Sequence, residues 1–132
     1  MKGIYEILCN NRVIIKNNNL IVEGLEAWAS AFPGGGLLTS FLIVHEFISP
    51  VSVNYENLMY KANTQIPLLS SNFSVGGGTL EVMVERTFGE DVVVAGLSLL
   101  FTVEKAISFC PVENVVLESG KPYKFIWRLI LD

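Results

Sequence analysis

Short apolar runs recur along this chain at a spacing of roughly ten residues, and no other feature limits its fold as strongly. The runs are rich in Val, Ile and Phe, and Gly, Pro and Asn separate them. This pattern is typical of antiparallel sandwiches and barrels, and 132 residues is the length of one domain. The sequence therefore predicts a mainly β protein, a single antiparallel β-sandwich of about seven to eight strands over residues 1–132.

Eight apolar segments are the expected strands, and two pairs of them should form hairpins. Asn10-Asn11 separates the first pair and Gly76-Gly77-Gly78 the second, and both linkers suit the left-handed backbone of a tight turn. The third segment is apolar at most positions, so it should be buried on both faces. The expected strands are 4–9, 12–16, 39–48, 66–75, 79–88, 91–101, 112–117 and 123–131.

One amphipathic N-terminal helix is expected over residues 19–32. Its apolar residues recur with helical spacing, Asn side chains precede it as candidate caps, and Pro33 with the following glycines should end it. Trp28 lies on the apolar face and is expected to anchor the helix, whereas Glu23 and Glu26 lie on the polar face.

The balance of charged and apolar residues restricts the partners of the chain. Charged residues make up 17% and apolar residues 51% of the sequence, which favours a subunit whose surface is covered by neighbours. Nine basic residues against thirteen acidic ones argue against a nucleic-acid partner. Glu6 interrupts the apolar start, and Pro and Gly interrupt the longest uncharged stretches, so neither a signal peptide nor a membrane span is expected.

Residues with catalytic or metal-binding chemistry are few. His45 is the one histidine of the sequence, and with Cys110 it could form the dyad of a small hydrolase. The simpler interpretation is a hydrogen-bonded strand histidine and an inert buried thiol. Glu81 and Glu85 should lie about 13 Å apart along a strand, which is too far for a glycosidase pair. With Cys9 and Cys110 far apart in sequence, we predict no disulfide, no catalytic residue, no metal site and no cofactor.

Two regions are expected to contact partners. Residues 49–65 lack clear periodicity, which predicts a long surface loop, and loops of this length are usually functional. Because Tyr and Met are enriched in interface cores, we predict an interaction arm that acts through Tyr55, Leu58, Met59 and Tyr60. The alternative is that the loop folds back over its own sandwich.

The second region is the last strand, whose alternation produces one core face and one mixed face. The mixed face carries Lys124 and Arg128. We expect these cations to pair with acids such as Glu23 and Glu26 of the helix, or with acids of an adjacent copy, and to steer association.

Three segments, NNNLIVEGLEAWASAF, VVVAGLSLLF and PYKFIWRLIL, together resemble a diffuse class of tailed-bacteriophage virion proteins. In that class an Asn-rich turn, a helix start, a central strand, a variable loop, an Ala-Gly-Leu strand and a last strand with a Trp core follow in this order. Residues 45–50 depart from the class, which often has a small-residue turn here, so this region is expected to meet a different partner. The matching residues are Asn19, Ile21, Val22, Gly24, Leu25, Trp28, Ala95, Gly96, Leu97, Ile126 and Trp127.

The resemblance implies a non-enzymatic structural subunit of a virion tail, neck or baseplate. Such a subunit is made in the host cytoplasm and binds copies of itself and other virion proteins as a homo-oligomer. A capsid decoration protein is an alternative within the same class. From a different class, the alternative is a small glycan-binding or ligand-binding sandwich with Tyr55, Tyr60 and Trp28 as stacking surfaces.

Overall fold

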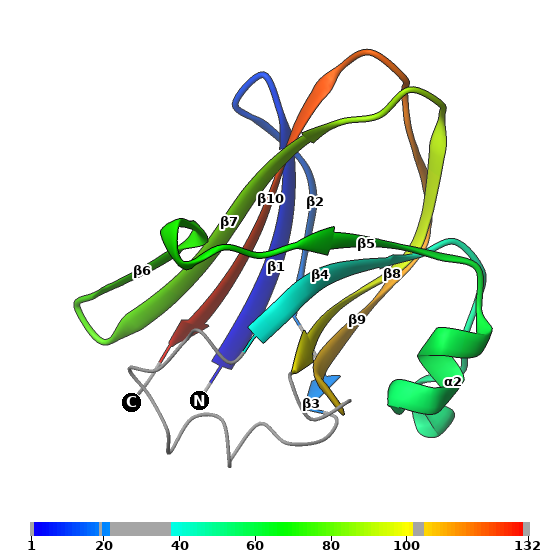
Figure 1. Ribbon diagram of the computed structural model, residues 1–132, viewed down its shortest axis with the longest axis horizontal. Helices are drawn as coiled ribbons and strands as arrows, with labels where there is room; N and C mark the ends of the chain where they lie inside the picture. Colours follow the sequence, from blue (N-terminus) through cyan, green and yellow to red (C-terminus); the bar gives the residue numbers. More distant parts are fainter. Residues whose placement is uncertain (1, 19, 22–37, 102–104, 131–132) are drawn as a thin grey trace.

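The computed structural model describes residues 2–18, 20–21, 38–101 and 105–130. These residues form two antiparallel five-stranded sheets that pack face to face, with one short helix beside them (Figure 1). The predicted mainly β, antiparallel sandwich is therefore confirmed.

Each sheet combines strands from both halves of the chain. In sheet A they are β1 (Lys2–Cys9), β2 (Arg12–Asn18), β6 (Phe73–Gly76), β7 (Thr79–Thr87) and β10 (Pro122–Ile130). In sheet B they are β3 (Leu20–Ile21), β4 (Leu38–Val44), β5 (Asn63–Pro67), β8 (Val92–Phe101) and β9 (Lys105–Leu117). The spatial orders are β2-β1-β10-β7-β6 and β3-β9-β8-β4-β5, so β10 and β8 are the central strands.

Both predicted hairpins are confirmed at their turns. Asn10 and Asn11, with φ of 52° and 64°, join β1 to β2, and Gly77 and Gly78, with φ of 60° and 75°, join β6 to β7. Positive φ at both central residues matches the right-handed twist of the flanking strands. The register of the first hairpin shifts between Ile7 and Leu8, which leaves Ile14 as an extra, bulged residue of β2.

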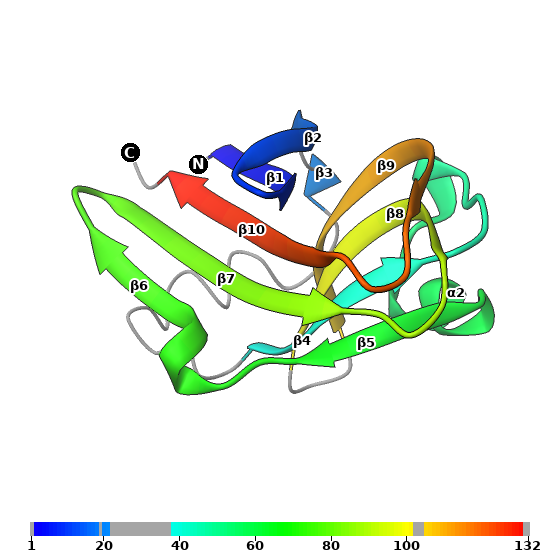
Figure 2. The ribbon, with the colours of Figure 1, turned by 90° about the horizontal axis from the view of Figure 1, so that it is seen from above.

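The single strand predicted over 66–75 is wrong, because this segment crosses from one sheet to the other (Figure 2). Pro67 ends β5, and the 3-10 turn η3 (Ser70–Asn72) leads into β6. The Asn72 side chain holds the crossing, since its oxygen accepts a hydrogen bond from the Leu69 N–H at 2.7 Å. With β3 added, the described residues contain ten strands rather than eight.

The predicted helix over 19–32 differs at its start. Leu20 and Ile21 form β3, which pairs with Phe109 and Ser108 of β9, so the backbone there is extended. Residues 22–32, including Trp28, lie outside the described residues.

Aromatic side chains from the inner strands fill the core between the sheets. Tyr5, Phe41, Phe125 and Trp127 are fully buried. The ring of Phe41 lies 5.6 Å from those of both Tyr5 and Phe125, in edge and tilted contacts that aromatic pairs favour. The Tyr5 hydroxyl forms a hydrogen bond with the Ser108 hydroxyl across the sheets. The predicted core face of the last strand is confirmed at Tyr123, Phe125, Trp127 and Leu129, which are all buried. Leu131, the last predicted member of this face, lies outside the described residues.

Strand β4 is buried on both faces, as the sequence predicts. Phe41 and Ile43 belong to the core between the sheets. Leu42 and Val44 point the other way, into a second apolar cluster on the outer face of sheet B. The helix α2 (Tyr55–Tyr60) covers that cluster and adds a third layer at this end of the sandwich (Figure 1).

Candidate interaction surface

Residues 49–65 are not the open loop that the sequence predicts. The 3-10 turn η2 (Pro50–Ser52) and α2 lie within this stretch, and β5 follows. The side-chain oxygen of Asn54 caps α2 by accepting a hydrogen bond from a backbone N–H of its first turn at 2.8 Å. The backbone N–H of His45 donates to the backbone carbonyl of Ala62 at 2.8 Å, and the Glu46 carboxylate accepts from the backbone N–H of Ala62 at 2.7 Å. These bonds hold the residues just before the segment against Ala62 near its end.

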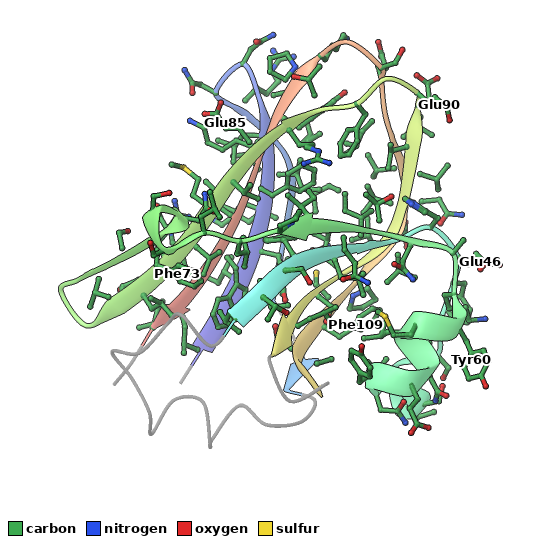
Figure 3. All side chains as sticks on the ribbon, viewed as in Figure 1. Glu46, Tyr60, Phe73, Glu85, Glu90 and Phe109 are labelled. Carbon is green, nitrogen blue, oxygen red and sulfur yellow. The ribbon has the colours of Figure 1, made fainter. Side chains whose placement is uncertain are left out.

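The predicted arm residues divide into packed and exposed ones. Leu58 is fully buried against the outer face of sheet B, and Tyr55 and Met59 pack around it. Tyr60 is 88% exposed and points away from the molecule at the far side of α2 (Figure 3). Leu58 therefore fits the alternative in which the segment folds back over its own sandwich. Tyr60 is the predicted arm residue whose side chain lies outside the core.

The two predicted cations of β10 form ion pairs within the chain. Arg128 Nε lies 2.8 Å from Glu81 Oε2 on β7, and Arg128 Nη1 contacts the carboxylate of Glu6 on β1. Lys124 Nζ lies 3.8 Å from Glu85 Oε1, also on β7. Strand acids are thus the partners in the described part of the chain, because the strand register places Glu81 and Glu85 directly opposite these cations. The other expected partners, Glu23 and Glu26, lie outside the described residues.

The possible Cys–His dyad is not assembled. His45 Nδ1 lies 2.7 Å from the Val93 carbonyl and Nε2 lies 2.8 Å from the Thr64 hydroxyl, so both ring nitrogens have other partners. Cys110 lies within β9, which begins seven residues before the predicted strand, and its side chain is buried in the inter-sheet core. Burial raises the pKa of the Cys110 thiol to about 11, although a hydrogen bond with Asn17 opposes this. Cys9 and Cys110 are both free thiols.

Among the described residues, the sandwich edge is open between residues 14–17 of β2 and residues 111–115 of β9, whereas η3 and the crossing segment connect the two sheets at the other edge (Figure 2). A groove of about 1200 Å³ runs along the open edge, between residues 14–17 of β2 and residues 111–115 of β9. Strand β9 bulges here, because Val94 pairs with Val115 but Gly96 pairs with Pro111. Within the described residues, β3 pairs with β9 only at Ser108 and Phe109, so the edge of β9 is free along the groove.

A second depression adjoins the groove. It has a volume of about 400 Å³, and Phe47, Ile48 and Tyr60 line it beside α2. Phe47 and Ile48 also line the groove, and Phe47 is 73% exposed. The two depressions therefore form one surface, which we call the apolar band: Ile14, Phe47, Tyr60, Val112 and Val115.

Sequence reasoning placed Tyr60 on a contact surface but missed Phe47 and Ile14. Phe47 falls near the end of the segment 39–48, which the sequence pattern as a whole assigns to one buried strand. The strand in fact ends at Val44, so Phe47 leaves the sheet. The available signal was the departure of residues 45–50 from the bacteriophage pattern.

Comparison of the chain with protein families, with curated proteins and with solved structures finds no significant match. In the part of the chain that the structure describes, no cluster of three or more His, Cys, Asp or Glu could hold a metal ion. None of the described helices is long and apolar enough to cross a membrane.

Proposed function

We propose that the chain is a non-enzymatic structural subunit of a bacteriophage virion, in the tail, neck or baseplate, present in many copies. The observation that carries this proposal is the apolar band along the open sandwich edge. Exposed apolar surface of this kind marks sites of protein association, and neighbouring subunits that cover Phe47 and Tyr60 would remove it from water.

The resemblance to tailed-bacteriophage proteins supports the virion as the setting. Ala95, Gly96 and Leu97 lie on β8, and Ile126 and Trp127 lie on β10, so these matching residues occupy the central strand of each sheet. They are also tightly constrained: Trp127 is fully buried, and a side chain at Gly96 would collide with the Phe109 ring. A resemblance at such positions concerns the framework of the fold.

The test is to find the protein in particles. An antibody against the purified chain should label bacteriophage particles in electron micrographs at repeated, symmetric positions, and the neighbouring reading frames should encode portal, capsid or tail proteins. Labelling of the tail, neck or baseplate supports the proposal, and labelling of the head would assign the chain to capsid decoration instead. Particles without label, from a lysate that contains the protein, would contradict the virion role.

A glycan-binding module is the second candidate, and the depression beside α2 favours it. Aromatic Phe47 and Tyr60 and polar Ser52 and Asn57 line this depression, which is a combination that suits stacking and hydrogen bonding to a sugar. Titration with a glycan panel tests it: saturable binding that Tyr60→Ala reduces at least tenfold would favour this function over assembly. Unchanged binding in Tyr60→Ala would remove the depression from consideration.

A further inference from the structure

Among the described residues, sheet A ends in two free edges. Strands β2 and β6 lie at opposite ends of the sheet (Figure 2), and an edge strand presents unpaired backbone N–H and C=O groups that can accept another strand. Natural edges are commonly protected by charged residues, but Phe73–Gly76 contains none. Val75 of this edge is 58% exposed.

The charges on the outer face of sheet A alternate in sign from strand to strand. The register sets Lys16 of β2 opposite Glu6 of β1, and it sets the two cations of β10 opposite the two acids of β7. The β2 end of this face is thus positive and the β7 end negative. In order, the charged residues are Lys16, then Glu6, then Lys124 and Arg128, then Glu81 and Glu85.

Two further charges at these strands, Arg12 and Arg86, do not lie on the outer face. The register sets Arg12 opposite Cys9 and Arg86 opposite Tyr123, so both alternate onto the inner side of sheet A, Arg12 at the β2 end and Arg86 on β7. If β2 of another copy lay beside the uncharged β6, the alternation of signs would continue. Two β2 edges would instead bring together two strands that each carry the positive charge of Lys16, which is unfavourable.

Exposed apolar residues lie at the same two ends. Val13 and Ile14 are exposed at the β2 end, and Leu69, Val75 and Met83 are exposed at or next to β6. Joining these ends would remove both sets from water, in addition to pairing the backbone edges. Charge and apolar exposure are separate observations: the exposed apolar residues favour a contact at these two ends, and the charges favour a contact between unlike ends.

We infer that the free edge of β6 in one copy pairs with the free edge of β2 in the next copy, so that sheet A continues from subunit to subunit. This inference rests on the proposed many-copy role and specifies its contact. A contact between two different surfaces leaves one of each free after every addition, and it therefore builds a ring or a filament. The added strand also covers the β2 wall of the groove.

Three lysine substitutions at exposed positions test this contact by sedimentation of the full chain. Ile14→Lys, 38% exposed, blocks the β2 edge, and Val75→Lys blocks the β6 edge. Val116→Lys is the matched control, because Val116 is 53% exposed but lies near the end of β9. Wild type and Val116→Lys should sediment as multimers, and each edge variant alone should sediment as a 14.6 kDa monomer.

Mixing the two edge variants is the decisive measurement. Each retains one intact edge of a different kind, so an equimolar mixture should form species of twice the monomer mass and nothing larger, which also shows that both variants fold. Edge variants that keep the wild-type mass, edge variants that dimerise alone, or a monomeric wild type would each overturn the inference. The virion role is judged separately by particle labelling, so labelled particles together with unaffected edge variants would reject only the β6–β2 contact.

Discussion

The outer faces of the two sheets differ in what protects them from water. On sheet B the outward side chains include Leu42, Val44 and Phe109, and α2 lies over them. On sheet A they include Glu6, Lys124 and Arg128, and cross-strand ion pairs hold this face without a covering layer in the described part of the chain. The sheets have the same number of strands among the described residues, and the difference lies in the side chains alone.

This contrast shows how a sandwich acquires a third layer. An apolar outer face is stable only when something covers it, and a face of paired charges tolerates solvent. The stability of the two faces should therefore depend on different quantities: buried apolar volume on sheet B, and charge pairing on sheet A. Four substitutions test this difference.

Leu58→Ala should have the largest effect. It removes the central apolar contact between α2 and sheet B, and the free energy of unfolding should fall by about 2–5 kcal/mol. Urea denaturation measures this. Tyr60→Ala in the same helix is the control, with an expected change within about 0.5 kcal/mol because its side chain is exposed. Equal losses in the two variants would mean that α2 is not held by its buried face.

Arg128→Met should have the next largest effect, on the opposite face. The substitution leaves Glu6, 6% exposed, without its cation, and a buried polar group that loses its partner costs about 1–3 kcal/mol. The double variant Arg128→Met/Glu6→Gln should recover part of the loss, since it removes the unpaired charge. If the double variant were less stable than the single one, the pairing of charges would not be what holds this face.

Gly96→Ala measures how tightly the outer face of sheet B is packed. A Cβ at this position would lie 2.6 Å from Cε1 of the Phe109 ring, so the ring must shift beneath the covering layer, at a cost of roughly 1 kcal/mol or more. Gly89→Ala is the control, because no atom lies within 4 Å of its added Cβ. Thermal melting compares the two, and Phe109→Leu should relieve the cost in the Gly96→Ala background. Equal melting of the two alanine variants would indicate a loosely packed layer.

Lys124→Met should have the smallest effect. Its contact with Glu85 is long, at 3.8 Å, and the Glu85 side chain is 66% exposed. Such surface pairs contribute about 0.2–1 kcal/mol, less at high salt. Urea denaturation at low and high ionic strength should separate this variant from wild type only at low salt. A loss as large as that of Arg128→Met would show that the ion pairs of sheet A act as one network.

The parts of the fold that the sequence predicts are those determined by residues close together along the chain. Asn10-Asn11 and the core face of β10 follow from local turn chemistry and alternation. The crossing between β5 and β6 does not, because it depends on which sheet each half joins. Helix α2, with six residues, is too short for a periodic signal, so its cap at Asn54 and its buried Leu58 became evident only in the structure.

The candidate surface was predictable only in part for the same reason. Arg128 was found as a charged residue of a mixed face, but its partner Glu6 is 122 positions away, and only the pairing of the first strand with the last brings them together. Tyr60 was found by residue type. Ile14 became a groove residue because of a bulge, and a bulge shifts the register without changing the apolar pattern.

The pairing of the first strand with the last has a consequence for how the chain folds. Strand β1 pairs with β10 from Lys2 opposite Ile130 to Cys9 opposite Tyr123, so the first and the last described strands lie side by side (Figure 1). A newly made β1–β2 hairpin must therefore wait for nearly the whole chain before its second neighbour exists. Closing so long a loop makes folding slow. An unfinished polypeptide that lacks β10 would also present two bare edges in the middle of sheet A, and these are sites where nascent chains aggregate.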